Sequence, residues 1–522
     1  MGIRSIELIS EKDSVGEGFY FKLNGKPVYM KGANYIPQNI FLPEVDQEDY
    51  SNLINDVVDA NMNMLRVWGG GVYEADFFYQ LCDVKGVLVW QDFMFACAMY
   101  PGDEAFLENI KQEAIENVKR LRQHPSIALW CGNNENSEGW YRWGWKDGKT
   151  EAQQQKIWEG YYAVFNRILP RVVDSLHPSL SYWESSPKFG RGDNRYQFEG
   201  DAHDWWVWHD GYPFEHFEEE VPRFMSEFGF QSFPSYEAIK YFTELDTINL
   251  SDLSFANHQK HARGFSLIRE YMERDFPVPS KGEDYVYMSQ VLQAYGITKG
   301  IYAHRRAKPY NMGTLYWQLN DCWPAVSWSS IDGLGNWKAL HYQAKKAFGN
   351  VIISTSKNEN ELDVYIVNDT FSEIKDTLVI SHLGFNGSVL FKEVALVVSP
   401  INSSTIVYKY QFKNKEFDHN NTFLKITFGE SEYYYYFAKP KDLKLINEPI
   451  AIEIIKNKDG FLIKLNSETL QKDVFLFSEE KGTWQDNFFD VLPEVSKEIQ
   501  FKTDAEIVPI INFKTLNQFI QH

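Results

Sequence analysis

The chain of 522 residues has few cysteines and no long apolar run. Its four cysteines, Cys82, Cys97, Cys131 and Cys322, are scattered singly, and no C-x-x-C pair is present. This spacing argues against a zinc or redox centre and favours buried free thiols. No segment approaches the roughly 18 uninterrupted apolar residues of a membrane span, so we predict no membrane partner.

Clusters of basic residues are also lacking. The formal net charge is −20 and no run of Lys and Arg stands out, which argues against nucleic acid as a partner. The start, MGIRSIELISEKD, has no apolar core of a signal peptide. The oligomeric state and the compartment stay open, although the Asn-, Lys- and Ile-rich tail favours a bacterial periplasmic protein.

Aromatic residues, in contrast, are abundant. They make up 16% of the chain and include 16 tryptophans, of which all but Trp484 lie between Trp68 and Trp337. Tryptophan combines a flat apolar face with one N–H donor, which suits a sugar ring edged by hydroxyls. Most of these large side chains are still expected in the core, so the enrichment is compatible with carbohydrate binding without requiring it.

The chain length predicts about three domains. In residues 27–350, short apolar runs alternate with helical segments such as 46–61 and 104–125. The expected strands are 28–34, 63–68, 87–92, 127–135, 180–186, 200–205, 223–229 and 313–321. Apolar strands linked by helices favour a parallel sheet covered on both faces, and eight of them predict an α/β fold, a catalytic (β/α)8 TIM barrel.

The flanking segments have the pattern of β-structure. Residues 1–26 contain strands with an Asn24–Gly25 turn, which we interpret as the remnant of a preceding β-sandwich domain with an exposed edge. Residues 351–441 and 442–522 consist of short alternating strands divided by polar turns. They predict two immunoglobulin-like β-sandwich domains after the barrel.

Two carboxylates occur where barrel strands should end. Glu135 follows Asn134 at the end of segment 127–135, and Glu227 lies near the end of segment 223–229. Carboxyl ends of barrel strands meet at one face, where the active site lies, so these residues can meet although they are far apart in sequence. Two carboxyl groups about 5–5.5 Å apart are what a retaining glycoside hydrolase needs. Taken singly, either residue could instead be a solvated acid or an ion-pair partner.

Longer motifs resemble a known family. They are RVWGGGVYE at 66–74, WQDFMFACAMYP at 90–101, GNNE at 132–135, GDAHDWWVWH at 200–209, SEFGFQSFP at 226–234, YWQLNDCWPAVSWSSID at 316–332 and DNFFDVLPE at 486–494. Together they are similar to the β-mannosidases of glycoside hydrolase family 2. The W-GGG and NDCWPA segments distinguish these enzymes from related galactosidases and glucuronidases.

The resemblance implies roles for individual residues and requires no metal or organic cofactor. Glu135 would be the general acid/base, Glu227 the nucleophile, and Asn134 a ligand of the sugar 2-hydroxyl. Arg66 would pair with Glu227 and keep it ionised, whereas a partly apolar pocket would keep Glu135 protonated. The other residues expected at the sugar pocket are Trp68, Trp143, Trp317, His203, Asp92 and Asn320. For Asp92 and Asn320 a purely structural role is an equal alternative.

The expected function is therefore the removal of terminal non-reducing β-D-mannose from β-mannosides or mannooligosaccharides with retention of configuration. The alternatives are an endo-β-mannosidase, an exo-β-glucosaminidase, or a carbohydrate-binding fragment without activity. Family members carry two β-domains before the barrel, and the first contributes an acidic side chain to the sugar pocket. Only the last strands of those domains are expected here, which leaves activity open.

Overall fold

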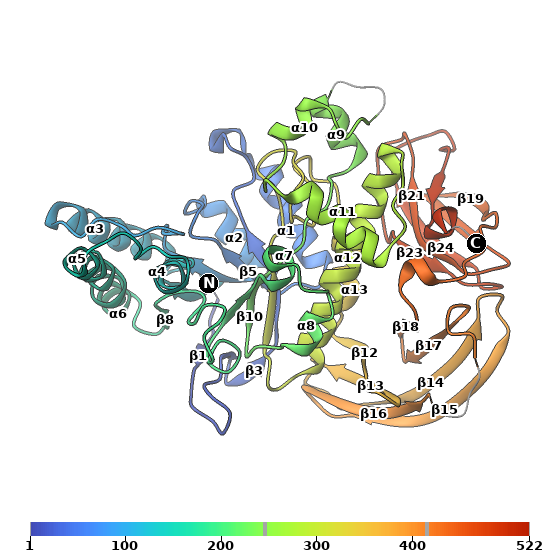
Figure 1. Ribbon diagram of the computed structural model, residues 1–522, viewed down its shortest axis with the longest axis horizontal. Coiled ribbons are helices and arrows are strands. Elements are labelled where there is room, and N and C mark those ends of the chain that lie inside the picture. Colours follow the sequence, from blue (N-terminus) through green and yellow to red (C-terminus); the bar gives the residue numbers. More distant parts are fainter. Residues whose placement is uncertain (1, 244–247, 413–416, 521–522) are drawn as a thin grey trace. The chain divides into compact units, whose positions relative to one another are not determined.

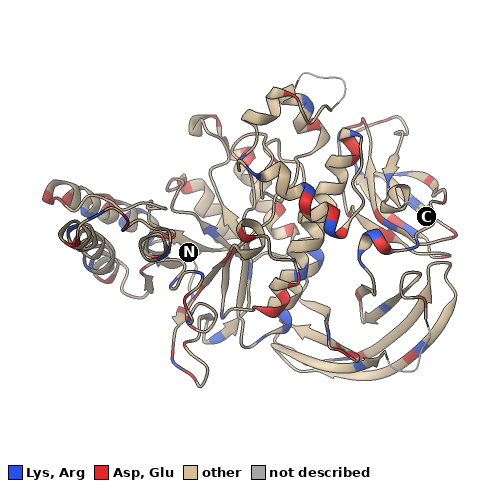
Figure 2. Cartoon of the chain, in the orientation of Figure 1, with Lys and Arg blue, Asp and Glu red and all other residues tan. Residues whose placement is uncertain are grey.

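The structure is a computed structural model that describes residues 2–243, 248–412 and 417–520 (Figure 1). The chain divides into two compact units. The first comprises Met1–Phe230, Lys299–Pro324 and Trp328–Asn336, and the second comprises Gln231–Thr298, Ala325–Ser327 and Trp337–His522. Within the described ranges, no helix is both long and apolar enough to cross a membrane. Acidic and basic residues are interspersed along the helices (Figure 2).

The first unit is built on a parallel sheet of eight strands. These are β4 (Met30–Tyr35), β5 (Met64–Val67), β6 (Leu88–Asp92), β7 (Ile127–Cys131), β8 (Tyr182–Trp183), β9 (Ala202–Asp204), β10 (Met225–Phe228) and β11 (Gly313–Tyr316). Their order is β8-β7-β6-β5-β4-β11-β10-β9, and every neighbouring pair is parallel. Because the first strand pairs with the last, the sheet curls into a (β/α)8 barrel, which confirms the predicted fold class. The ladder is open between β8 and β9.

Several strands are shorter than the sequence pattern predicts. The predicted strand 127–135 ends at Cys131, and the predicted strand 313–321 ends at Tyr316. Beyond β7 the pairing continues as isolated parallel bridges from Asn134 to Ala96 and Ser186. Glu135 has a φ of 61° and precedes helix α4 instead of extending β7.

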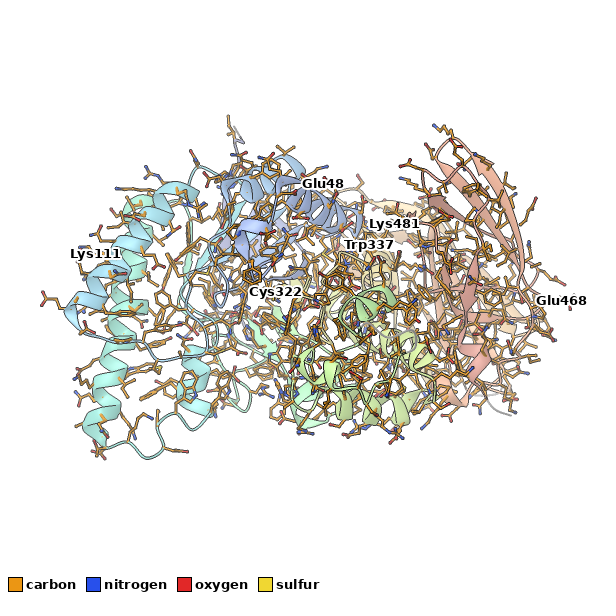
Figure 3. All side chains as sticks on the ribbon, turned by 90° about the horizontal axis from the view of Figure 1, so that it is seen from above. Glu48, Lys111, Cys322, Trp337, Glu468 and Lys481 are labelled. Carbon is orange, nitrogen blue, oxygen red and sulfur yellow. The ribbon has the colours of Figure 1, made fainter. Side chains whose placement is uncertain are left out.

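Helices surround the barrel strands. Helix α1 (Gln47–Asp59) begins after Asp46, whose carboxylate accepts the backbone N–H groups of Glu48 and Asp49. Helix α3 (Glu104–Leu121) has the basic residues Lys119 and Arg120 in its last turn, where they interact favourably with the helix dipole. Polar side chains such as Glu48 and Lys111 lie on the exposed faces of these helices (Figure 3). The unit also contains η1 (Leu42–Glu44), α2 (Asp76–Lys85), α4 (Asn136–Arg142), α5 (Glu151–Tyr162), the π-helical η2 (Ala163–Ile168), α6 (Leu169–Leu176), α7 (Trp206–Asp210) and α8 (His216–Glu219).

A small antiparallel sheet precedes the barrel. It contains β1 (Ile6–Ile9), β2 (Tyr20–Leu23) and β3 (Lys26–Val28), in that order. Asn24 and Gly25, both with positive φ, form the predicted turn between β2 and β3. The buried Phe19 ring lies 5.6 Å from the Trp90 ring, and the Arg4 guanidinium donates to the Ile127 carbonyl at the start of β7. The sheet therefore packs on the barrel where β7 begins.

The second unit contains helices and two β-sandwiches. Its helices are α9 (Tyr236–Thr243), α10 (Leu253–Asn257), α11 (Gly264–Asp275), α13 (Ala339–Ala347) and most of α12 (Gly282–Arg306), with the 3-10 turns η3 (Pro440–Asp442) and η4 (Leu516–Phe519). The first sandwich joins the sheets β12-β13-β16 and β15-β14-β17-β18. Its strands are β12 (Val351–Lys357), β13 (Glu361–Asn368), β14 (Ile374–Gly384), β15 (Val389–Ser399), β16 (Ser403–Gln411), β17 (Thr422–Phe428) and β18 (Ser431–Tyr436). Its core includes Leu362, Ile380 and Ile426.

The second sandwich joins the sheets β19-β20-β24-β22 and β23-β21-β25. Its strands are β19 (Ala451–Asn457), β20 (Gly460–Asn466), β21 (Gln471–Phe477), β22 (Thr483–Trp484), β23 (Phe489–Val491), β24 (Lys497–Lys502) and β25 (Asn512–Lys514). Phe461, Ile463 and Leu465 alternate along β20 and belong to the core. This alternation is the period of a strand with one buried face, as the sequence pattern predicts.

Candidate active site

Polar side chains from the carboxyl ends of the barrel strands meet in one buried cluster. Arg66 lies on β5 and Glu227 on β10, and Arg66 Nη1 donates to Glu227 Oε1 at 2.6 Å. Arg66 Nη2 donates to Asn134 Oδ1, beyond β7, at 2.7 Å. The contacts bring together residues 161 and 68 positions apart in sequence. The predicted convergence of polar strand ends is therefore present.

Arg66 organises the cluster and has no N–H group left over. Its Nε and one Nη2 hydrogen go to Asp92, at 3.3 and 2.8 Å. Its remaining Nη1 hydrogen goes to Asn34 Oδ1 at 3.0 Å, beside the bond to Glu227. With the bond to Asn134, all five guanidinium hydrogens are used. Arg66 thus positions its neighbours and has no donor to offer a sugar.

Asp92 lies behind this guanidinium. The side chain is fully buried, and its oxygens also accept the Gly69 backbone N–H at 3.0 Å and the Trp90 indole N–H at 2.9 Å. All these partners belong to the protein. The arrangement favours the structural alternative for Asp92, in which it fixes Arg66, over direct contact with substrate.

Glu135 is held by its backbone and by two side chains. Its N–H donates to the Ser186 carbonyl at 2.8 Å, and its own carbonyl accepts the Gly139 N–H at 2.8 Å. These bonds stabilise a left-handed conformation that costs a non-glycine residue about 1 kcal/mol or more. The carboxylate faces His203 Nδ1 at 2.8 Å through Oε1 and the Cys97 thiol at 3.5 Å through Oε2.

The two carboxylates lie close together. Glu227 Oε2 is 3.4 Å from His203 Nδ1, the atom that also contacts Glu135. Glu135, His203 and Glu227 each bring one atom within 4.8 Å of the others. Retaining glycosidases hold their carboxyl groups about 5–5.5 Å apart, whereas inverting enzymes need a wider gap for a water molecule. The separation fits the retaining class.

The electrostatics of this cluster differ from the prediction. Burial raises the pKa of the Glu227 carboxyl group, with a further contribution from Glu135, and His203 and Arg66 offset this only partly. Burial alone would also raise the pKa of Glu135, but the hydrogen bond and charge of His203 bring it below its ordinary value. The prediction was the reverse: a lowered pKa for Glu227 and a protonated Glu135. It was wrong for Glu227 because burial outweighs the effect of Arg66 on the pKa, and wrong for Glu135 because it did not place the His203 imidazole against that carboxylate.

His203 is itself held by a buried network that the sequence analysis missed. Its Nε2 lies 2.9 Å from Ser186 Oγ, and the Ser186 and Ser226 hydroxyls each donate to Asp201 Oδ2 at 2.6 Å. Burial would lower the pKa of His203, but Glu227 and Glu135 raise it above its ordinary value. Asp201 lies two residues before His203, inside the GDAHDWWVWH motif, and could have been identified there.

The tryptophans expected at the sugar pocket fall into two groups. Trp68 and Trp317 follow β5 and β11 directly, and their rings meet edge to face with centroids 5.1 Å apart. They therefore lie at the same end of the barrel as the carboxylates. Trp143 caps the end of α4, is 38% exposed, and packs edge to face on Trp145.

Asn320 connects two loops at the mouth of the barrel. Its Nδ2 donates to the Ile36 carbonyl at 2.9 Å, and the Ile36 N–H donates to its Oδ1 at 3.4 Å. The side chain thereby joins the loop after β11 to the loop after β4. As with Asp92, these contacts favour the structural alternative.

The spacing of Glu135, His203 and Glu227 would also admit a divalent cation. The hydrogen bond between His203 Nδ1 and Glu135 Oε1 already occupies two of these side chains with each other.

Models of two protein domains match the C-terminal part of the chain. Residues 360–442 match a "Mannosidase Ig/CBM-like domain", and residues 445–518 match the "Ig-fold domain" of mannosidases. The two sandwiches are therefore immunoglobulin-like, as predicted.

Known proteins are similar over a longer part. A β-mannosidase of Capra hircus is 37% identical over 401 residues, which cover 71% of this chain and 44% of the relative. β-Mannosidase B of Aspergillus flavus is 36% identical over 376 residues, which cover 70% of this chain and 44% of that relative. The crystal structure of a β-D-mannosidase from Dictyoglomus thermophilum superposes with a TM-score of 0.91 at 35% identity, covering 98% of this chain and 63% of that one. The chain thus spans less than half the length of these two curated relatives.

Proposed function

We propose that this chain, which belongs to the β-mannosidase family, is a retaining exo-β-mannosidase that releases terminal non-reducing β-D-mannose. Glu135 is the general acid/base and Glu227 the nucleophile. The observation that carries the proposal is the approach of these two carboxylates within 4.8 Å at the carboxyl ends of the barrel strands β7 and β10. That separation supports a double displacement, in which the enzyme itself bonds to the sugar.

In the first step, Glu227 attacks the anomeric carbon while Glu135 protonates the departing oxygen. The glycosidic C–O bond breaks, a glycosyl ester forms on Glu227, and the alcohol leaves with the proton. Arg66 Nη1 holds Glu227 Oε1, which leaves Oε2 as the attacking atom. In the second step, Glu135 removes a proton from water, and the hydroxide displaces Glu227 from the sugar.

Asn134 is positioned to recognise the sugar 2-hydroxyl. Its Oδ1 is held by Arg66 Nη2, which orients the amide and leaves Nδ2 pointing toward the Cys97 thiol at 3.5 Å. A thiol is a weak acceptor, so a hydroxyl can replace it. Trp68 and Trp317 supply the apolar ring faces that a sugar packs against.

The first test is the release of nitrophenol from a panel of aryl β-glycosides by the chain as it stands. We expect turnover of the β-mannoside and its loss in Glu227→Ala. The matched control is Glu74→Gln, which alters another buried carboxylate, hydrogen-bonded by Tyr35 and Tyr50, outside the proposed chemistry. Full activity in Glu227→Ala would refute the assignment, as would a folded chain that hydrolyses no mannoside.

Products separate the remaining alternatives. An exo-acting enzyme releases only mannose from mannooligosaccharides, whereas an endo-acting enzyme releases shorter oligosaccharides first. An exo-β-glucosaminidase would prefer the aryl β-glucosaminide of the panel. Binding of mannooligosaccharides without any hydrolysis would indicate a carbohydrate-binding protein. By NMR, the first product of a retaining enzyme is β-mannose, and initial α-mannose would contradict the double displacement.

A further inference from the structure

We propose that Asp201 and Ser186 are positioning residues that fix the tautomer of His203, so that His203 Nδ1 and Glu135 Oε1 hold one catalytic proton between them. The acid/base of the reaction is then this pair and not an isolated glutamate. The inference deepens the proposed function and rests on it for its catalytic meaning, but its structural part can be tested without activity.

The network begins at Asp201, whose carboxylate accepts four hydrogen bonds. Oδ1 accepts the Trp183 indole N–H at 2.8 Å and the Lys188 backbone N–H at 3.1 Å. Oδ2 accepts the Ser186 and Ser226 hydroxyls, each at 2.6 Å. An ionised carboxylate offers acceptor sites for about four donors and no hydrogen of its own. The fully buried Asp201 therefore acts purely as an acceptor.

The hydrogen count at Ser186 then determines the state of His203. A hydroxyl has one hydrogen, and Ser186 gives it to Asp201. Toward His203 Nε2, 2.9 Å away, Ser186 Oγ can only accept. Nε2 must therefore carry a hydrogen, and a neutral His203 has its lone pair on Nδ1.

That lone pair faces the catalytic carboxylate. His203 Nδ1 and Glu135 Oε1 are 2.8 Å apart, a hydrogen-bond distance. If both groups were deprotonated, two lone pairs would oppose each other in a buried site. One proton between them removes this repulsion, whether it resides on the carboxyl group or on the imidazole. The raised pKa of His203 and the lowered pKa of Glu135 indicate that in the free enzyme it lies toward the imidazole.

Other charged groups lie near the pair of His203 and Glu135 and influence its protonation. Glu227 Oε2 lies 3.4 Å from Nδ1, and the buried Arg66 and Glu138 act on the pair through their charges. During the first step, the shared proton passes through the Glu135 carboxyl group to the leaving oxygen, which leaves Glu135 ionised and His203 neutral. In the second step, the pair takes a proton from water and returns to its first state.

We call the hydrogen-bond chain from Asp201 through Ser186 to His203 the relay. The variant Asp201→Asn tests the relay because it should reverse the direction of these hydrogen bonds. The Asn amide donates to Ser186 Oγ, so Ser186 turns its hydrogen toward His203 Nε2. Neutral His203 then carries its hydrogen on Nδ1 and donates it to the Glu135 carboxylate. The deprotonated pair is stabilised, and the alkaline limb of the pH profile of kcat/KM should move down by about one pH unit, the size expected for one charge-assisted hydrogen bond.

Two further variants separate this relay from the simple loss of the Asp201 charge. Ser186→Ala should also lower the alkaline limb, and adding Asp201→Asn to it should change nothing more, because Asp201 acts through Ser186. Ser226→Ala is the matched control: it removes a hydroxyl from the same Asp201 oxygen and should leave the limb in place. A full additional shift in the double variant would overturn the relay.

The closing experiment reads the tautomer directly. NMR of protein labelled with 15N-histidine, with His203 assigned by its loss in His203→Gln, should show Nε2–H in the neutral imidazole of the wild type and Nδ1–H in Asp201→Asn. An Nδ1–H tautomer in the neutral imidazole of the wild type, or no change of the neutral tautomer in Asp201→Asn, would overturn the proposal. An inactive chain with the expected tautomers would refute the proposed function and leave the relay standing.

Discussion

Arg66 Nη1 donates to Glu227 Oε1 at 2.6 Å, and this guanidinium has no hydrogen bond left for any ligand. The nucleophile is thus oriented by a fully buried cation that also fixes the amide of Asn134. Placement of the reacting groups at this site depends on a planar five-donor fork. A lysine supplies the charge but cannot reproduce that geometry.

Arg66→Lys should therefore lower kcat/KM for an aryl β-mannoside by about 100-fold, the loss that a small misplacement of reacting groups produces. The positive charge is kept, so the effect reports geometry. The measurement is steady-state kinetics, with thermal unfolding to verify that the variant is folded. A change of less than about threefold would show that charge alone holds Glu227.

Asn134→Ala should remove recognition of the 2-hydroxyl. Because hydrogen bonds to this hydroxyl strengthen in the transition state, we expect kcat/KM for the β-mannoside to fall on the order of 100-fold. With the matching 2-deoxy substrate, the kcat/KM values of wild type and variant should differ by less than about tenfold, because neither protein can contact a 2-hydroxyl. Equal losses with the two substrates would place the role of Asn134 elsewhere, for instance in supporting Arg66.

Glu138 should make stability depend on pH. Burial, with a contribution from Glu135, raises the pKa of Glu138 from 4.5 to about 7. A carboxyl group with a raised folded-state pKa contributes stability that is complete below its unfolded pKa and is lost as the pH rises through the folded value. The window is therefore pH 4.5 to 7, and the contribution is roughly 3 kcal/mol.

Glu138→Gln carries no charge at any pH, and its oxygen can still accept the Arg191 backbone N–H. As the pH rises from 5 to 8, the free energy of unfolding of the variant should increase relative to that of the wild type. Urea unfolding at both pH values measures this difference. A difference between variant and wild type that is independent of pH would contradict the raised pKa.

Chelation should not affect activity. In the proposed reaction, Glu135 and His203 share a proton and Glu227 attacks the sugar, and none of these steps uses a metal ion. Dialysis against EDTA should leave kcat/KM for the mannoside unchanged. Loss of activity that Zn²⁺ or Mg²⁺ restores would contradict the assignment.

The fold and the two carboxylates could be predicted because they depend on periodic or local patterns. Apolar strands that turn polar at their ends indicate a barrel, and Asn134-Glu135 and Glu227 fall at such ends. The strand that ends at Cys131, β7, was predicted too long. A pattern of residue types does not reveal that Glu135 adopts a left-handed conformation.

The Asp201–Ser186–His203 network could not be predicted in the same way. It crosses the open seam between β8 and β9, where no backbone ladder fixes the register. The lowered pKa of Glu135 also depended on this network, because the sequence cannot place the His203 imidazole against that carboxylate. The structural contacts of Asp92 and Asn320 likewise needed coordinates to separate them from sugar binding.

The proposed double displacement requires that Glu227 bonds covalently to the sugar. The most direct test is to incubate the chain with 2-deoxy-2-fluoro-β-mannosyl fluoride, which slows both steps but the second one more, and to locate the label by peptide mass spectrometry. We expect one 2-deoxy-2-fluoromannosyl adduct, on Glu227, and none in Glu227→Ala. Turnover of the mannoside without an adduct, or an adduct on another residue, would contradict it.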